Sequence, residues 1–165
     1  MNRQYGFRRG FSTETAVISL ADQIRNQLGE KRHTAAIFID LCKAFHTVDH
    51  SLLLEKLNVV GFTQQTKNWF QSYLENRNQY VELQGKSSSK EQVSCGVTQG
   101  SILGPILFLI YINDINAALK NSSTVLYADD TVFHISYKCP ETIERMMQEE
   151  FSELNEWLLD NKLLP

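Results

Sequence analysis

The chain has 165 residues, of which 42% are hydrophobic and 21% are charged, and its formal net charge is −3. This length and composition suit one globular domain of ordinary size. They exclude a transmembrane helix, because the longest apolar stretch, residues 102–112, is about half of the roughly 20 residues that such a helix needs. A signal peptide is also excluded, since the first ten residues are polar and basic.

The first half of the chain alternates between helical and strand patterns. Apolar residues at helical spacing predict an amphipathic helix over residues 13–28. The continuous apolar run 34–40 is typical of a central strand buried on both faces, and it ends at Asp40. Residues 49–61 and 63–77 predict two further helices.

The second half continues this mixture, without an internal repeat or a low-complexity linker. Residues 79–97 predict two strands around a polar turn. A buried helix is expected at 105–119, with Pro105 suitably placed in its first turn. Residues 124–136 predict a β-hairpin, and a last helix is expected from Pro140. The order of elements indicates an α+β fold in one domain.

The negative charge is concentrated near the C-terminus. Residues 141–160 hold seven acids and one base, whereas the rest of the chain carries 15 basic and 12 acidic residues. This asymmetry is compatible with a basic binding face and an acidic solvated back. The three cysteines form no C-x-x-C pair, which predicts buried or free thiols in an intracellular protein of the cytoplasm or nucleus.

Two adjacent acids, Asp129 and Asp130, interrupt the predicted hairpin. An ordinary tight turn explains such a pair, because aspartate side chains bond the local backbone. Adjacent side chains on a straight strand point to opposite faces, so the two carboxylates converge on one site only if the chain turns there.

If the hairpin pairs beside the strand that ends at Asp40, three acids gather at one sheet edge, and their repulsion calls for a cation. Mg²⁺ takes such oxygen ligands, and two ions can support phosphoryl displacement. The spacing permits this site without proving it.

Five segments in order resemble the reverse transcriptases of non-LTR retrotransposons, and the jockey-like group in particular. They are "QYGFRRGFST" (4–13), "FIDLCKAF" (38–45), "GVTQGSILGPILFLIYINDI" (96–115), "YADD" (127–130) and "LNEWLLDNKL" (154–163). The resemblance implies a polymerase palm, with a four-stranded ferredoxin- or RRM-like antiparallel sheet and helices on one face. It also implies one domain fragment, 1–165, with part of the fingers in 1–33, the palm in 34–165 and no thumb.

The resemblance further implies a catalytic role for four residues. Asp40, Asp129 and Asp130 would bind Mg²⁺ or Mn²⁺ as the acidic triad of an RNA-directed DNA polymerase. Lys162 would protonate or neutralise the leaving pyrophosphate, although the helix dipole alone favours a lysine at the end of a helix.

Nucleotide contacts are implied for two loops. The backbone of Leu41, Cys42, Lys43 and Ala44 would lie along the incoming triphosphate. Phe45 would crowd a ribose 2′-hydroxyl and so favour deoxynucleotides, or would simply belong to the core. Gln99 and Gly100 match a loop that contacts the template and the incoming nucleotide, where glycine lets the backbone approach a ligand.

Three arginines complete the implied binding residues. Arg8 would contact the triphosphate, and Arg9 and Arg77 would contact nucleic acid, since a guanidinium suits a bidentate grip on phosphate. An exposed arginine at the start of a strand is the simpler interpretation of Arg77. His46 and His50, four residues apart, offer a metal pair only if a helix spans them, and none is expected there.

Three residues depart from the family pattern: Phe11, where a basic residue is common, His46, where an acid is usual, and Thr98, where a proline is usual. The alternative hypothesis is therefore an inactive remnant that keeps the palm fold as a nucleic-acid-binding or non-functional module. The expected partners of an active enzyme are an RNA template, a DNA primer, deoxynucleoside triphosphates and other regions of the element's polyprotein, with no membrane.

Overall fold

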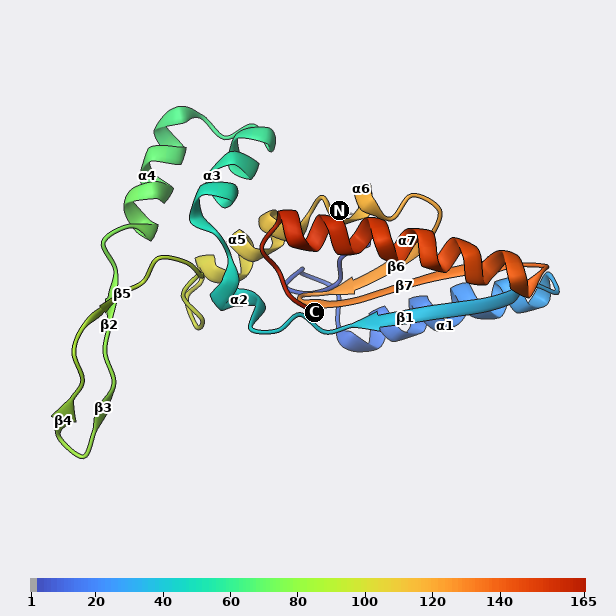
Figure 1. The fold of residues 1–165 in the computed structure, drawn as a ribbon, viewed down its shortest axis with the longest axis horizontal. Helices are drawn as coiled ribbons and strands as arrows, with labels where there is room; N and C mark the ends of the chain where they lie inside the picture. The colour runs from blue at the N-terminus through green and yellow to red at the C-terminus, as the bar shows by residue number, and fades with distance from the viewer. Residues whose placement is uncertain (1–2) are drawn as a thin grey trace. The chain divides into compact units, whose positions relative to one another are not determined.

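The computed structural model describes residues 3–165, which fold into two compact units (Figure 1). Unit 1 combines the chain up to Ala44 with Ile112–Pro165, and unit 2 is Phe45–Tyr111. Among residues 3–165, no helix is both long enough and apolar enough to cross a bilayer. The three cysteines are free and exposed.

Unit 1 is built on an antiparallel sheet of three strands in the order β1-β7-β6. These are β1 (His33–Ile39), β6 (Ser123–Tyr127) and β7 (Asp130–Tyr137). The predicted hairpin is confirmed, and it pairs with the predicted strand along the whole of β1. The prediction of a central position for β1 is wrong, because β7 covers only one edge of β1. Most of its residues are accordingly only half-buried.

A short N-terminal segment extends the sheet beyond β6. Gln4 and Leu126 form a parallel bridge, with hydrogen bonds from Tyr5 N to Leu126 O (2.8 Å) and from Leu126 N to Arg3 O (2.9 Å). Within the described residues, the sheet therefore has three strands and this one-bridge extension, in place of the four strands expected. A single bridge orders the segment without making it a regular strand.

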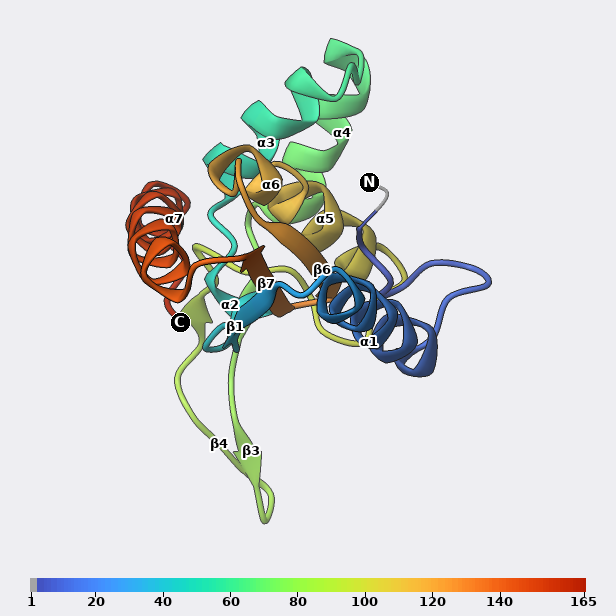
Figure 2. The ribbon, with the colours of Figure 1, turned by 90° about the vertical axis from the view of Figure 1, so that its right-hand side faces the viewer.

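Helices cover both faces of the sheet in unit 1. α1 (Thr13–Gly29) lies on one side and α7 (Pro140–Asp160) on the other (Figure 2). The prediction of helices on one face is thus wrong. The reason lies in β7, where the neighbours Phe133 and His134 point to opposite faces and are 0% and 3% exposed. A strand that is buried on both sides needs a covering element on each.

Local sequence explains where these two helices begin. Ser12 caps α1, since its side chain accepts a hydrogen bond from Thr15 N while Thr15 Oγ1 accepts one from Ser12 N. Pro140 occupies the first turn of α7, where its missing N–H costs nothing. The predicted buried helix at 105–119 is instead two helices, α5 (Leu103–Ile112) and α6 (Ile115–Ala118), which are separated at residues 113–114.

Unit 2 begins with the short helix α2 (Ala44–Thr47), followed by α3 (His50–Val59) and α4 (Gln64–Leu74). Asp49 caps α3 by accepting a hydrogen bond from Leu52 N at 3.0 Å. An exposed arm follows, in which four two-residue strands pair in two steps around a turn at residues 84–85. They are β2 (Asn78–Gln79), β3 (Glu82–Leu83), β4 (Lys86–Ser87) and β5 (Glu91–Gln92). The two expected strands are therefore short and interrupted.

Candidate active site

The paired aspartates lie at a tight turn in unit 1. Tyr127 pairs with Asp130 across the hairpin, so Ala128 and Asp129 form the two-residue loop and Asp130 opens β7. Ala128 has a positive φ of 55°, which is uncommon for a residue with a Cβ. The chain therefore turns where the two acids follow each other, which is the condition for both carboxylates to serve one site.

The third acid comes to the same end of the sheet. Ile39 is paired with Thr131, so that Asp40, the next residue, comes level with Asp130. The pKa of Asp130 is raised by burial and by the negative charges of Asp129 and Asp40. The predicted set of three acids is thus close enough to interact electrostatically.

The three carboxylates suit a cation in their chemistry but do not form a closed cage. Asp40 and Asp130 are exposed, and Asp129 is half-buried. Across residues 3–165, no group of three or more His, Cys, Asp or Glu side chains is arranged to hold a metal ion. Open clusters of oxygen ligands of this kind suit Mg²⁺, which keeps several ligand positions for water or substrate phosphate.

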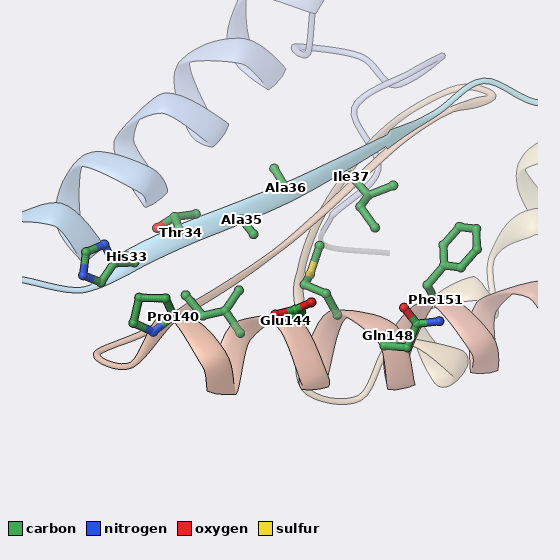
Figure 3. A pocket seen from close by; sticks show the side chains of 11 residues that line it. His33, Thr34, Ala35, Ala36, Ile37, Pro140, Glu144, Gln148 and Phe151 are labelled. Carbon is green, nitrogen blue, oxygen red and sulfur yellow. The ribbon is translucent and has the colours of Figure 1, made fainter.

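A cavity of about 340 Å³ lies between α1 and this end of the sheet. Asp40 and Asp130 line it together with apolar side chains that include Val17, Phe38 and Val132. A larger cavity of about 620 Å³ lies between β1 and α7, where Figure 3 shows Ala35, Ile37 and Phe151 around it. None of the predicted site residues lines the larger cavity. The smaller cavity is therefore the one that belongs to the candidate site.

The N-terminal segment holds the turn through a residue that the sequence analysis did not select. Gln4 is buried, and its side-chain amide bonds both backbone polar atoms of Ala128. Arg8 donates from Nη1 to Gln4 O at 2.9 Å, and its guanidinium lies 4.7 Å from the centroid of the Phe11 ring. Gln4 carries no titratable group. It opens the first of the five segments that resemble the family, but no role was assigned to it there.

The remaining predicted residues of unit 1 differ in exposure. Leu41 and Ala44 are buried, whereas Cys42 and Lys43 are exposed. Arg9 is exposed as well, and Lys162 is an exposed residue with a positive φ of 53° just beyond the end of α7.

In unit 2, Phe45 is half-buried and stacks on Phe108, with ring centroids 4.6 Å apart. Its carbonyl oxygen accepts a hydrogen bond from Val97 N at 2.7 Å. The ring thus has a core partner, as the interpretation of Phe45 as a core residue requires, although it is not fully buried.

Arg77 and Gln99 line one groove of unit 2, of about 500 Å³, together with His46 and Thr98. Arg77 lies over the ring of Tyr73, with its guanidinium carbon 5.5 Å from the ring centroid. Gly100 is exposed and has a φ of 83°. Two of the predicted nucleic-acid and nucleotide contacts, Arg77 and Gln99, therefore share one groove.

His46 and His50 do not lie on one helix in the described part of the chain. His50 Nε2 is bonded to Gly96 O at 2.8 Å, and α2 ends at Thr47 before α3 begins at His50. The absence of one helix across the two residues agrees with the sequence-based expectation.

The family comparison covers nearly the whole chain. The family described as "Reverse transcriptase (RNA-dependent DNA polymerase)" matches residues 1–164. The chain belongs to the reverse transcriptase family. The resemblance to retrotransposon reverse transcriptases, which was inferred from five segments, is thereby confirmed.

Two curated relatives of this reverse transcriptase chain come from mobile elements of Drosophila melanogaster. It is 31% identical over 163 residues to the probable RNA-directed DNA polymerase from transposon BS, a match that spans 94% of this chain and 18% of that protein. It is 29% identical to the RNA-directed DNA polymerase from mobile element jockey, again with 93% of this chain and 18% of the relative. The chain therefore spans less than a fifth of the length of these two relatives.

A solved structure supports the reverse transcriptase fold. The apo telomerase from Candida tropicalis, truncated from its C-terminal domain, superposes with a TM-score of 0.61 at 16% identity. The match covers 92% of this chain and 32% of the telomerase chain. At this identity the likeness concerns the fold alone, and it confirms a mixed α+β architecture.

Proposed function

We propose that this chain is the catalytic core of an RNA-directed DNA polymerase of a non-LTR retrotransposon. The enzyme would copy an RNA template by adding deoxynucleotides to the 3′ end of a DNA primer. The observation that carries the proposal is the strand register, which brings the end of β1 at Asp40 level with Asp130, beside the Asp129 turn. Family membership supplies the reaction class.

In this proposal Asp40, Asp129 and Asp130 hold Mg²⁺ or Mn²⁺. When bound, such ions polarise phosphoryl oxygens and stabilise the attacking and leaving oxygens of the displacement. The protein's own contribution is a cluster of oxygen ligands whose mutual repulsion a divalent cation relieves. The pKa of Asp130 is raised first by partial desolvation of its carboxylate and then by that repulsion from Asp129 and Asp40. Because the cluster is open, we expect weak metal binding until substrate phosphates add their oxygens.

The other assigned roles extend the same proposal. Residues 41–44 and Arg8 would contact the triphosphate, and Gln99 and Gly100 would contact the nucleotide and template. Arg9 and Arg77 would bind nucleic acid through phosphate, and Lys162 would neutralise the pyrophosphate. Residues 1–33 would belong to the fingers and 34–165 to the palm. The enzyme would act inside the cell, alongside other regions of the element's polyprotein.

A non-catalytic remnant is the second candidate function. His46 and Thr98, at positions where the family pattern has an acid and a proline, favour it. Thr98 O nevertheless accepts hydrogen bonds from both Ser101 N and Ser101 Oγ, so the loop before Gln99 has local order without proline.

Primer extension on an RNA template separates the two candidates. The chain should be assayed alone and in a chimera in which it replaces the matching segment of the jockey polymerase. We expect Mg²⁺-dependent extension by the chimera and none by the same chimera with Asp129→Asn. Equal extension by both would show that the activity arises elsewhere, and no extension by either would favour the remnant.

His46→Asp with Thr98→Pro should raise the chimera's rate if these departures reflect decay.

The nucleotide-selecting role of Phe45 has its own test. Phe45→Ala in the active chimera should relax discrimination against ribonucleotides, because the ring would otherwise crowd the 2′-hydroxyl. Phe108→Ala is the matched control, since it removes the stacking partner and leaves the Phe45 ring in the chain. If both variants lose stability and neither changes the ratio of deoxy- to ribonucleotide incorporation, Phe45 is a core residue.

A further inference from the structure

Gln4 makes a two-point contact with the peptide groups of Ala128. Its Oε1 accepts a hydrogen bond from Ala128 N at 2.9 Å, and its Nε2 donates to Ala128 O at 3.2 Å. The same Oε1 accepts a second hydrogen bond from Gly6 N at 2.7 Å. With 6% of its surface exposed, Gln4 is a buried polar side chain whose acceptor and donor are both used.

The turn that receives these bonds needs external support. Ala128 has a φ of 55°, a left-handed conformation that is strained for a residue with a Cβ. Such conformations persist when contacts with the surrounding structure hold them in place. Ala128 is also buried, so its N–H and C=O cannot turn to water, and the side chain of Gln4 supplies both of their partners.

The segment around Gln4 is itself fixed in place. The backbone on both sides of Gln4 bonds Leu126 on β6, through Arg3 O and Tyr5 N. Arg8 Nη1 donates to the carbonyl oxygen of Gln4, which ties the residue to the loop ahead of α1. Gln4 therefore approaches Ala128 from an anchored backbone, as a rigid positioning group must.

We propose that Gln4 is a positioning residue that holds Ala128 and thereby sets the direction in which Asp129 and Asp130 leave the turn. Gln4 touches neither carboxylate in this role and acts only through the Ala128 backbone. The consequence for metal binding rests on the proposed function, whereas the hold on the turn does not. The two parts can therefore be measured separately.

The first measurement is amide hydrogen exchange of this chain without metal, resolved by residue with NMR. Gln4→Met, which keeps the length and apolar stem of the side chain, should speed exchange of the Ala128 amide about five- to tenfold, as loss of one net hydrogen bond implies. The amides of Phe133 and Ile135 in β7 should exchange as in the wild type. Gln23→Met is the matched control, because it removes another glutamine contact of unit 1, to His134, away from the turn.

Gln4→Glu provides a second variant in case the first fails to fold. It keeps the acceptor for Ala128 N and replaces the donor to Ala128 O with a second acceptor, so its effect on Ala128 exchange should be intermediate. Unchanged Ala128 exchange in a folded Gln4 variant overturns the proposal. A change confined to Ala128 and its neighbours supports it.

The second measurement is the Mn²⁺ affinity of each variant, followed by water proton relaxation. Gln4→Met should weaken the Asp129-dependent binding several-fold, and Gln23→Met should leave it unchanged. If Asp129→Asn weakens binding but Gln4→Met does not, the positioning role is overturned. If wild type and Asp129→Asn bind Mn²⁺ equally, the metal site of the proposed function fails, and a faster exchange at Ala128 still supports the hold of Gln4 on the turn.

Discussion

Gly6 lies where the N-terminal segment meets the turn between β6 and β7. A Cβ added there would stand 2.2 Å from Ala128 N and 2.9 Å from Ala128 Cα, far inside van der Waals contact. These are backbone atoms, which cannot swing aside as the end of a side chain can. Only glycine therefore lets the segment approach Ala128 closely enough for Gln4 to reach its N–H and C=O.

Gly6→Ala should lower the free energy of unfolding by about 2 kcal/mol or more, because the backbone must shift to relieve the overlap. Urea denaturation followed by circular dichroism measures this change. Gly29→Ala is the control, since nothing lies within 4 Å of a Cβ at Gly29 and alanine favours the last turn of α1. Equal stabilities of the two variants would contradict the close approach at Gly6.

Ala128→Gly should cost less than an alanine-to-glycine change elsewhere in the sheet. Glycine adopts the positive φ of residue 128 without strain. This gain offsets the greater conformational freedom that glycine has in the unfolded chain. We expect stability within about 1 kcal/mol of the wild type, on the stabilising side. Ala36→Gly in β1, where φ is negative, should be destabilising by about 0.5–1 kcal/mol. A larger loss at 128 than at 36 would be inconsistent with this account.

At the scale of elements, α7 is fastened to the start of β6 by a buried carboxylate. Glu150 is 2% exposed, and its Oε1 accepts hydrogen bonds from the backbone N and side-chain Nδ2 of Asn121, while its Oε2 accepts one from Ser122 Oγ. Every bond is charge-assisted, which compensates the burial of the charge. The loop ahead of β6 thus takes its position from the helix.

Glu150→Ala should destabilise the protein by about 2–3 kcal/mol, because it leaves the donors of Asn121 and Ser122 without their partner and opens a cavity. Thermal or urea unfolding measures the loss. Glu153→Ala, one turn along the same helix, removes only an exposed ion pair to Lys120 and should change stability by less than about 1 kcal/mol. Equal effects would mean that the buried network contributes little.

At the scale of the whole molecule, the sheet of unit 1 buries a histidine in the middle of β7. The pKa of His134 is lowered by burial and by the positive charge of Arg3. Its Nε2 is 3.2 Å from Gln23 Oε1 on α1, and no charged partner compensates a proton on the ring among the described contacts. His134 is therefore neutral in the folded protein at neutral pH.

Stability should fall as the pH is lowered below the usual histidine pKa of about 6.5. Between that value and its lower folded pKa, His134 takes up a proton in the unfolded chain but not in the folded one, so acid favours unfolding. Urea denaturation at several pH values between about 7.5 and 5.5 measures the slope. His134→Gln should flatten the dependence, and an unchanged slope would assign it to another histidine.

The sequence by itself determined the kind and order of most elements and the identity of the acidic set. Hydrophobic periodicity located α1, α3, α4 and α7 to within a few residues, because side-chain spacing is a local property of each segment. Five segments in order, among them the motif around Asp40 and the Asp129–Asp130 pair, were sufficient to infer the family, which the comparisons confirm. The caps at Ser12 and Asp49 are local for the same reason, because each side chain bonds a backbone N–H three residues further along the chain.

Only the tertiary structure decided what depends on segments that are distant in the sequence. An apolar run cannot show whether β1 is central or at an edge, since the number of partner strands is set by the rest of the sheet. It also cannot show that α1 and α7 lie on opposite faces. Gln4 and Ala128, which are hydrogen-bonded, lie 124 positions apart in the sequence. The role of Gln4 depends on its burial and on its hydrogen-bond geometry. Side chains with the chemistry of metal ligands could be predicted from residue type. The packing contacts that support them could be found only in the folded chain.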